Sequence, residues 1–249
     1  MRLDQFLVLH KNIQSRTKAQ ELIESGQVQV NGKTILKSSW NTSEHDQVDI
    51  LDADLLKYVS RAGLKLESAF KRLNLDIKNK TVLDIGQSTG GFTDCCLQMG
   101  AGQIVGFDVG EQQLHSKLID HPQVLSFEKS NVKTVLSNAN FQKTIPPKGF
   151  DLVVCDVSFI SLTYCVDLIS TVLAAGGYYL LLVKPQFECG EKNLDKNGIV
   201  KNPLIYKQVQ EKIIEIYQHQ VGPCLDYFES GLPGRDGNKE FFIYGHKKN

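Results

Sequence analysis

Short apolar runs alternate with longer amphipathic segments from residue 80 onward, and this alternation constrains the fold more than any other feature of the sequence. Short continuous apolar runs are typical of strands buried on both faces of a parallel sheet, whereas the segments between them have helical spacing. Such an alternation predicts parallel strands covered by helices on both faces. The predicted strands are 81–85, 103–108, 124–127, 151–155, 178–183, 225–228 and 240–245. The predicted helices are 92–99, 112–119, 160–173 and 204–218.

The size of the chain leaves room for a second, smaller domain. The chain has 249 residues, of which 41% are hydrophobic and 22% charged, as in ordinary soluble globular proteins. The predicted sheet begins near residue 80, whereas residues 1–57 read as two short helices followed by short strands. We therefore expect an α/β protein with a Rossmann-like seven-stranded sheet in residues 58–249, preceded by a small α+β domain in residues 1–57. A late hairpin over 225–245 would close the sheet.

Charge is unevenly placed along the chain, although 28 Lys and Arg balance 28 Asp and Glu. Residues 1–39 hold six basic and three acidic side chains, residues 40–60 hold one basic and five acidic, and residues 61–80 hold six basic and two acidic. The acidic stretch at 51–54 is expected to be a linker. The two basic stretches can form one positive surface, which would attract nucleic-acid phosphates.

Secretion, membrane insertion and metal binding have no support in the sequence. The first residues lack the apolar region of a signal peptide, and the longest apolar stretch, 172–183, is interrupted by Gly176 and Gly177. No cysteine forms a C-x-x-C pair, and no histidine lies at zinc-ligand spacing. We expect a cytoplasmic protein without a metal site and without a membrane partner. Reduced thiols are expected at Cys95, Cys96, Cys155, Cys165, Cys189 and Cys224.

The first domain resembles the small RNA-binding domain shared by a small-subunit ribosomal protein, pseudouridine synthases and tyrosyl-tRNA synthetases. Ser15 is placed to cap a second helix that Gly26 ends, and Asn31-Gly32 between apolar residues predicts a hairpin. The residues that carry the resemblance are Arg2-Leu3-Asp4, Ser15-Arg16, Lys18-Ala19, Leu22-Ile23, Gly26, Val28, Val30-Asn31-Gly32, Asp46 and Val48. The resemblance implies that Arg2, Lys11, Arg16 and Lys18 face RNA phosphates. An ordinary solvated helix face is the alternative.

A glycine-rich segment, Leu83-Asp-Ile-Gly-Gln-Ser-Thr-Gly-Gly-Phe-Thr93, follows a predicted strand and opens a helix. Its G-x-x-x-G-G spacing differs from the G-x-G-x-x-G of dinucleotide-binding folds, and it lacks the Gly-Lys-Ser/Thr of a P-loop. Within it, residues 86–90 match G-x-S-x-G, the nucleophile elbow of α/β-hydrolases. Ser88 would then need Glu229 or Asp236 and His246 as partners, but no segment before the elbow supplies the oxyanion hole.

We favour a pocket for S-adenosylmethionine at this segment. The predicted ligands on the loop and at its flanks are Asp84, Gly86, Ser88, Thr89, Gly90, Gly91 and Phe92. Glycines allow the backbone to turn sharply and to approach a ligand closely. Asp108 ends the next strand about 24 residues after Asp84, where an acid can bind ribose hydroxyls, and Asn131 follows the third strand, within reach of the adenine.

Charged residues stand at the ends of the later strands, where open α/β sheets place their active sites. Lys184 follows five apolar residues, Asp156 ends the preceding strand, and Glu240 starts the last one. Lys65 is expected to begin the helix before the sheet. Removal from water favours the neutral amine of Lys184, which can act as a base, although a neighbouring carboxylate opposes this. A surface charge is the alternative for each residue taken alone.

The chain as a whole resembles the hemolysin-labelled TlyA family of ribosomal-RNA 2′-O-methyltransferases, whose catalytic domain is related to FtsJ. The resemblance rests on Tyr58-Val-Ser-Arg61, Asp84-Ile-Gly86, Ser88–Thr93, Asp108-Val-Gly110, Asp156–Ser161, Leu182–Glu188 and Gly237–Phe241. It implies 2′-O-methylation of a ribose, in a cytidine of ribosomal RNA, with ribosomal RNA or ribosomal subunits as partners. It also implies a Lys-Asp-Lys-Glu tetrad at Lys65, Asp156, Lys184 and Glu240. Arg61 is added to the expected RNA-binding residues.

The resemblance also implies roles within the tetrad. Lys184 would deprotonate the ribose hydroxyl, Asp156 and Lys65 would position Lys184 and stabilise the oxyanion, and Glu240 would hold Lys65. Departures from the family pattern include Gln87 in the cofactor loop and Ala62 ahead of Lys65. Glu128-Lys-Ser-Asn131 is a third departure, in place of a Glu-Arg-Thr-Asn run. The first two are expected to crowd the cofactor pocket. The alternatives are a non-catalytic RNA-binding or ribosome-assembly protein and a membrane-active haemolysin.

Overall fold

The computed structural model describes all residues except 12, 14, 52–55, 235 and 249. Its chain divides into two compact units, Met1–Leu64 and Lys65–Asn249, and the helix α3 (Arg61–Leu73) runs across this division. The boundary expected after residue 57 falls inside the first unit. Most of the expected linker, at residues 52–54, lies outside the described residues.

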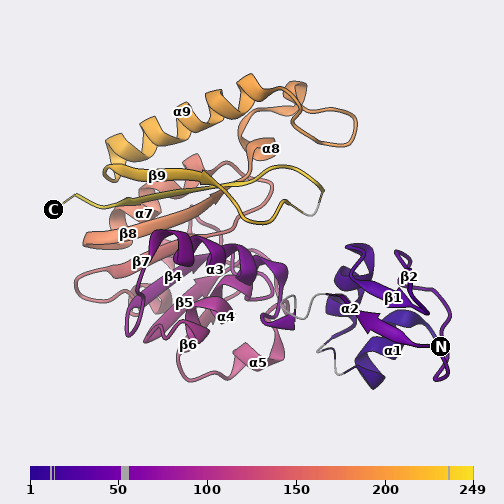
Figure 1. Cartoon of the computed structure of the whole chain (residues 1–249). Coiled ribbons are helices and arrows are strands. Elements are labelled where there is room, and N and C mark those ends of the chain that lie inside the picture. The colour runs from indigo at the N-terminus through magenta and orange to yellow at the C-terminus, as the bar shows by residue number, and fades with distance from the viewer. Residues whose placement is uncertain (12, 14, 52–55, 235, 249) are drawn as a thin grey trace. The chain divides into compact units, whose positions relative to one another are not determined.

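The first unit combines two helices with a three-stranded antiparallel sheet (Figure 1). Its elements are α1 (Leu3–His10), α2 (Arg16–Glu24), β1 (Val28–Val30), β2 (Lys33–Thr34) and β3 (Val48–Ile50), with strand order β2-β1-β3. Ser15 caps α2 as predicted, because its hydroxyl accepts a hydrogen bond from the Lys18 N–H. Asn31 and Gly32 both have positive φ, at 51° and 76°, and join β1 to β2 in the predicted hairpin.

The second unit contains the predicted seven-stranded sheet, with the order β6-β5-β4-β7-β8-β10-β9 (Figure 1). The strands are β4 (Thr81–Ile85), β5 (Gln103–Phe107), β6 (Val124–Phe127), β7 (Phe150–Cys155), β8 (Leu173–Val183), β9 (Cys224–Glu229) and β10 (Phe241–His246). The pairs among the first five strands are parallel, whereas β10 pairs antiparallel with both β8 and β9. The chain order reverses between β4 and β7, and such switch points place a crevice at the carboxyl ends of the strands.

Helices cover both faces of this sheet. The helical segments are α4 (Gly91–Gln98), α5 (Ser116–Ile119), η2 (Val135–Ser137), α6 (Ala139–Gln142), η3 (Leu162–Cys165), α7 (Val166–Val172), α8 (Pro185–Glu188), η4 (Glu191–Asn193) and α9 (Pro203–Gln220). Ile243 of β10 packs in a core shared with α7 and α9, whereas its neighbour Phe242 stacks on Phe92 of α4, with ring centroids 6.4 Å apart. Because successive strand residues point to opposite faces, α4 and α9 cover opposite faces (Figure 1).

Two of the predicted helices are shorter than expected. The segment 112–119 is helical only over Ser116–Ile119, because Gln112 has a φ of 53° and its N–H is bonded to the Glu128 carboxylate at 2.7 Å. The segment 160–173 begins as the 3-10 helix η3 and becomes α-helical only at Val166. Lys65 lies in the second turn of α3 rather than at its start. No helix among the described residues is long and apolar enough to cross a membrane.

A buried carboxylate organises the first unit. Asp4 is 0% exposed, and its Oδ2 accepts hydrogen bonds from Arg2, Arg16 and Gln20, each at 3.0 Å. The hydrogen bond from the Arg2 guanidinium holds the pKa of Asp4 well below its ordinary value, and Gln20 and Arg16 add to this while burial opposes it. Asp4 therefore fixes Arg2 and Arg16, two arginines that are predicted to bind RNA.

We expect Asp4→Asn to destabilise the first unit by about 2 kcal/mol near neutral pH, because charged hydrogen bonds are lost. A depressed pKa contributes stability that is present above the ordinary pKa of 3.8 and lost as pH falls below it. The difference between the variant and the wild type should therefore shrink below pH 4. Fluorescence of Trp40, the single tryptophan of the chain, reports unfolding of this unit. An equal difference at all pH values would contradict this role of Asp4.

Candidate functional site

A cavity of about 380 Å³ lies at the carboxyl ends of β4, β5 and β7, at the switch point of the sheet. Gly86 follows β4, Asp108 follows β5, and Asp156 follows β7, so each strand delivers a lining residue to the same edge. The lining residues are Ile85, Gly86, Ser88, Phe107, Asp108, Val109, Gln113, Ser130, Asn131, Val132, Asp156, Val157, Ser158, Phe159 and Ile160. A mostly apolar lining with a few polar groups is typical of small-molecule sites.

The glycine loop is shaped by two close approaches. Gly86 has a φ of +81°, and a Cβ there would lie 2.8 Å from the Asp156 carbonyl oxygen. Gly90 has a φ of +91°, and a Cβ there would lie 2.3 Å from Leu118 Cδ1. Both positions favour glycine because of their positive φ, and Gly86 also requires it for space because its close neighbour is backbone. The N–H groups of Gly86 and Gln87 donate to the Phe107 carbonyl at 3.0 and 3.1 Å, which ties the loop to β5.

Asp108 is held in place by the backbone on both sides of the cavity. Its Oδ2 accepts the Ser88 N–H at 2.9 Å, and its Oδ1 accepts the Gly110 N–H at 2.8 Å. Each oxygen retains a lone pair for a further donor. Asn131 also lines the cavity, and its side-chain oxygen accepts the Lys133 N–H at 2.9 Å.

Several predicted cofactor ligands lie elsewhere. Thr89, Gly90, Gly91 and Phe92 are absent from the residues that line the cavity. Gly90 and Gly91 start α4 instead, and Phe92 is 2% exposed and stacked on Phe242. These residues shape the loop and the core next to the cavity, and their contact with a ligand stays a prediction.

Gln87 points away from the cavity, contrary to the expectation that it crowds it. Its amide nitrogen donates to Thr93 Oγ1 at 2.9 Å, and its amide oxygen accepts the Ser126 hydroxyl at 2.6 Å. The space for it exists because residue 106 is glycine: a Cβ there would lie 2.3 Å from Gln87 Cδ. Gln87 therefore fills a gap beside β5 and β6 and leaves the cavity open.

Asp84 is fully buried beneath the loop. Its Oδ2 accepts the Thr93 hydroxyl at 2.6 Å, while its Oδ1 has no hydrogen-bond partner. Burial raises the pKa of Asp84 to about 7; the charges of Asp156 and Asp108 add to this, and the Thr93 hydroxyl opposes it. Asp84 does not line the cavity, so it supports the loop from below.

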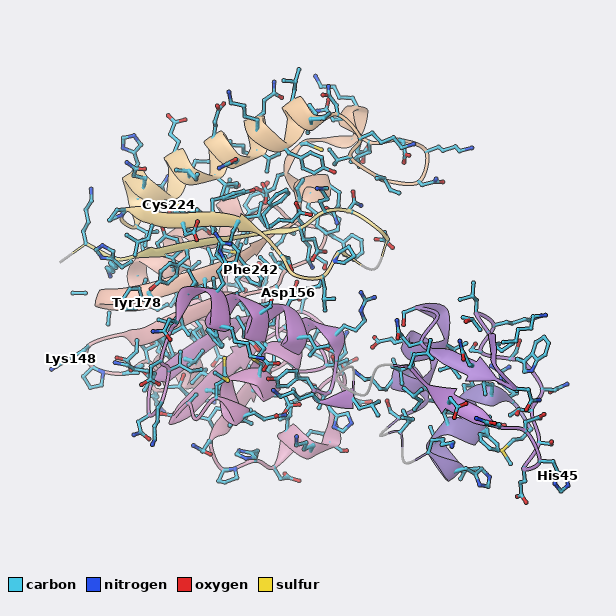
Figure 2. All side chains as sticks on the ribbon, in the orientation of Figure 1. His45, Lys148, Asp156, Tyr178, Cys224 and Phe242 are labelled. Carbon is cyan, nitrogen blue, oxygen red and sulfur yellow. The ribbon has the colours of Figure 1, made fainter. Side chains whose placement is uncertain are left out.

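The four charged residues of the predicted tetrad form two ion pairs. Lys184 Nζ lies 2.6 Å from Asp156 Oδ1, and Lys65 Nζ lies 2.5 Å from Glu240 Oε2. Lys65, Lys184 and Glu240 are each less than a tenth exposed. Glu240 reaches the same edge as Lys184 because β10 is antiparallel to β8 and pairs Phe241 with Val183. Figure 2 shows Asp156, which follows β7, well away from Lys148, which precedes it.

Ser158 is a contact of Lys184 that the sequence analysis missed. Lys184 Nζ donates to its hydroxyl at 2.7 Å, and both Ser158 and Asp156 line the cavity. The ammonium therefore contacts two residues of the cavity lining, although Lys184 is not itself a lining residue. The signal available in the sequence was the position of Ser158, two residues after Asp156 in a segment that already carried the resemblance.

No hydrolase triad forms around Ser88 among the residues that the structure describes. The Ser88 hydroxyl donates to Gln113 at 3.3 Å, whereas the His246 ring contacts Tyr178, with centroids 6.3 Å apart. Glu229 pairs with Lys239 at 3.0 Å. Figure 2 shows Tyr178 distant from Asp156, at the other end of the unit. The hydrolase alternative is therefore wrong.

The predicted RNA-binding residues differ in how much charge they expose. Arg2 and Arg16 are held by Asp4 and keep side-chain exposures of 41% and 53%, and Lys11 is exposed. Lys18 is only 4% exposed, and its ammonium donates to the Tyr58 carbonyl at 3.1 Å. Lys18 thus stabilises its own unit, contrary to the expectation that it faces RNA. Arg61, at the start of α3, is half-buried.

All six cysteines are free thiols, and Cys95, Cys96, Cys155 and Cys165 are buried. Within the described part of the chain, no group of three or more His, Cys, Asp or Glu side chains is arranged to hold a metal ion.

The buried Asp84 carboxyl should make stability fall as pH rises. A group whose pKa is raised from 3.8 to about 7 binds more protons in the folded state, so the cost appears between these values and is complete above pH 7. The shift corresponds to on the order of 4 kcal/mol. We expect Asp84→Asn to gain stability relative to the wild type by up to this amount between pH 4 and 8, in chemical unfolding followed by circular dichroism. Parallel pH profiles would contradict it.

Comparison with known proteins assigns both units. Residues 58–247 match the FtsJ-like methyltransferase family, and residues 1–48 match the S4 domain. The 23S rRNA (cytidine-2′-O)-methyltransferase TlyA of Campylobacter jejuni is 35% identical over 262 residues, covering 98% of this chain and 98% of its own. Hemolysin A of Brachyspira hyodysenteriae is 36% identical over 248 residues, covering 98% of this chain and 99% of its own.

A solved structure agrees with these relatives. A Streptococcus thermophilus protein described as a candidate hemolysin superposes with a TM-score of 0.76 at 31% identity, covering 100% of this chain and 89% of that one. The predicted fold and the predicted family are both confirmed. The chain belongs to the FtsJ-like methyltransferase family and carries an S4 domain in residues 1–48.

Proposed function

We propose that the protein transfers a methyl group from S-adenosylmethionine to the 2′-hydroxyl of a cytidine ribose in ribosomal RNA. The observation that carries the proposal is the ion pair between Lys184 and Asp156, a residue of the cavity lining, in a chain of the FtsJ-like methyltransferase family. The name of the Campylobacter jejuni relative supports the choice of cytidine and of ribosomal RNA.

The cavity fits S-adenosylmethionine in size and chemistry. Its volume of about 380 Å³ falls within the roughly 300–1,000 Å³ of small-molecule sites. Asp108 offers free lone pairs to ribose hydroxyls, Asn131 offers an amide to the adenine, and Gly86 leaves room beside Asp156. When bound, this cofactor supplies an electrophilic methyl group, so the protein's own part is to place and activate the hydroxyl.

In this proposal Lys184 first releases one proton to solvent, and the lone pair of its neutral amine then takes the proton of the 2′-hydroxyl, which restores the ammonium. Asp156 and Ser158 fix its Nζ at 2.6 and 2.7 Å, which leaves one position of the nitrogen for the substrate. Lys65, held by Glu240, adds a positive charge that stabilises the oxygen as it becomes an anion. Lys184 then releases this proton to solvent.

Lys184→Ala should lower kcat by about 10²–10⁴-fold, because the base is removed. The dissociation constant for S-adenosylmethionine, measured by calorimetry, should change little, since Lys184 is not among the cavity-lining residues. Lys201→Ala is a matched control, because Lys201 also pairs with an aspartate but is 73% exposed. Normal methylation of ribosomal RNA by the Lys184 variant, or loss of activity in the control, would refute the assignment.

The S4 domain is proposed to recognise folded RNA through phosphate contacts. Lys11→Ala should raise KM for RNA with kcat unchanged, and should reduce the slope of log affinity against log salt by about 1. Lys148→Ala, an exposed lysine of the second unit (Figure 2), serves as the control. If both variants bind RNA with the wild-type salt dependence, Lys11 has no role in RNA binding.

A further inference from the structure

The residues proposed to activate the hydroxyl stand on two loops. Asp156 and Ser158 belong to the segment between β7 and η3, and Lys184 follows β8 as the residue before α8. Neither segment has regular structure at these residues. The ion pair of 2.6 Å therefore depends on whatever holds the two loops against each other.

Glu188, the last residue of α8, joins these loops. Its Oε2 accepts the Ser161 hydroxyl at 2.5 Å, and its Oε1 accepts the Leu162 N–H at 2.7 Å. Lys212 of α9 lies 3.5 Å from Oε2 and donates to the Glu188 carbonyl at 3.2 Å. The Glu188 side chain is only 1% exposed. Glu188 is the last residue of the segment Leu182–Glu188. In the proposed mechanism, only Lys184 of this segment has a role.

A buried carboxylate is costly unless donors satisfy it, and burial of an ion pair is weak evidence of added stability. Glu188 has three kinds of donor, and two of them belong to the beginning of η3. The Tyr217 hydroxyl donates to the Leu162 carbonyl at 2.9 Å, so α9 holds the same point. The position of the start of η3 is therefore fixed by contacts from both α8 and α9.

We call these contacts of Glu188 with Ser161 and Leu162 the clamp. The segment next to them, Asp156–Ser161, is strained. Phe159 has a φ of 66°, in the left-handed region that disfavours a bulky side chain, and it is 87% exposed. Such a conformation persists only where neighbouring structure determines it. Asp156 and Ser158 on one side of Phe159 and the Glu188 contacts on the other determine it here.

We propose that Glu188 is a positioning residue, which locks the Asp156–Ser161 segment to α8 and thereby sets the contact between Lys184 and Asp156. This inference rests on the proposed function, in which Lys184 is the base. Glu188 is not among the residues that line the cavity, and it acts through the distance between Lys184 and Asp156, which stand on different loops.

The test compares Glu188→Ala and Glu188→Gln in the full chain. Glutamine can accept the Leu162 N–H and donate to Ser161 Oγ, so it should keep kcat within about threefold. Alanine removes both contacts, and kcat in single-turnover methylation should fall by about 10–100-fold with KM for RNA unchanged, because reacting groups are misplaced. Hydrogen exchange of the Leu162 amide should become at least about tenfold faster in the alanine variant only.

Asp151→Ala is the matched control. Asp151 accepts the same pair of donors, a backbone N–H at 2.8 Å and a hydroxyl at 2.9 Å, both from Thr81, but it lies at the opposite end of β7. Its loss should lower stability and leave kcat unchanged. If Asp151→Ala and Glu188→Ala lose kcat alike, or if Glu188→Ala keeps the wild-type kcat, the clamp is wrong.

The two proposals fail in different ways. A wild-type protein that does not methylate RNA refutes the proposed function, and the exchange measurement then still decides whether Glu188 locks the loop. A wild-type protein that is active, with normal Leu162 exchange and normal kcat in the alanine variant, refutes the clamp alone.

Discussion

The direction of each strand determines which charged side chains can meet. β4, β5, β7 and β8 run parallel, so Gly86, Asp108, Asp156 and Lys184 all arrive at one edge of the sheet. Glu240 precedes its strand instead of following it, and it reaches this edge only because β10 is antiparallel to β8. In a parallel orientation it would lie about 20 Å away, at the far end of a six-residue strand.

Several charged side chains whose burial is unfavourable lie at this edge of the sheet. Asp84 lies fully buried beneath the loop, with a raised pKa, and Asp156 and Asp108 contribute to that shift. Lys65 and Lys184 partly offset the carboxylates by pairing with Glu240 and Asp156. The sheet supplies the stability that such a site lacks, through an apolar core on both faces. The Asp4 cluster of the first unit is a different case, since its carboxylate is satisfied by several donors and its pKa falls.

Much of the fold and the charged site could be predicted because both follow from local pattern. Apolar runs located every strand of the second unit to within a few residues, except the early start of β8, and strand ends located Lys184 and Asp156. Side-chain direction was harder to predict, because the local sequence does not encode it. The Phe92 side chain packs in the core against Phe242, and the Lys18 ammonium donates to the Tyr58 carbonyl within its own unit. Ser158 and Glu188 were missed because their partners lie on other segments, 26 residues away in the chain.

Gln87 and Gly106 are coupled by space alone. The Gln87 amide occupies the volume that a side chain at residue 106 would take, and it replaces the lost packing with bonds to Thr93 and Ser126. Substitutions at these two positions are therefore epistatic. A side chain at residue 106 would displace the Gln87 amide and break its bonds to Thr93 and Ser126. We therefore expect relatives with a side chain at residue 106 to carry a smaller residue at 87.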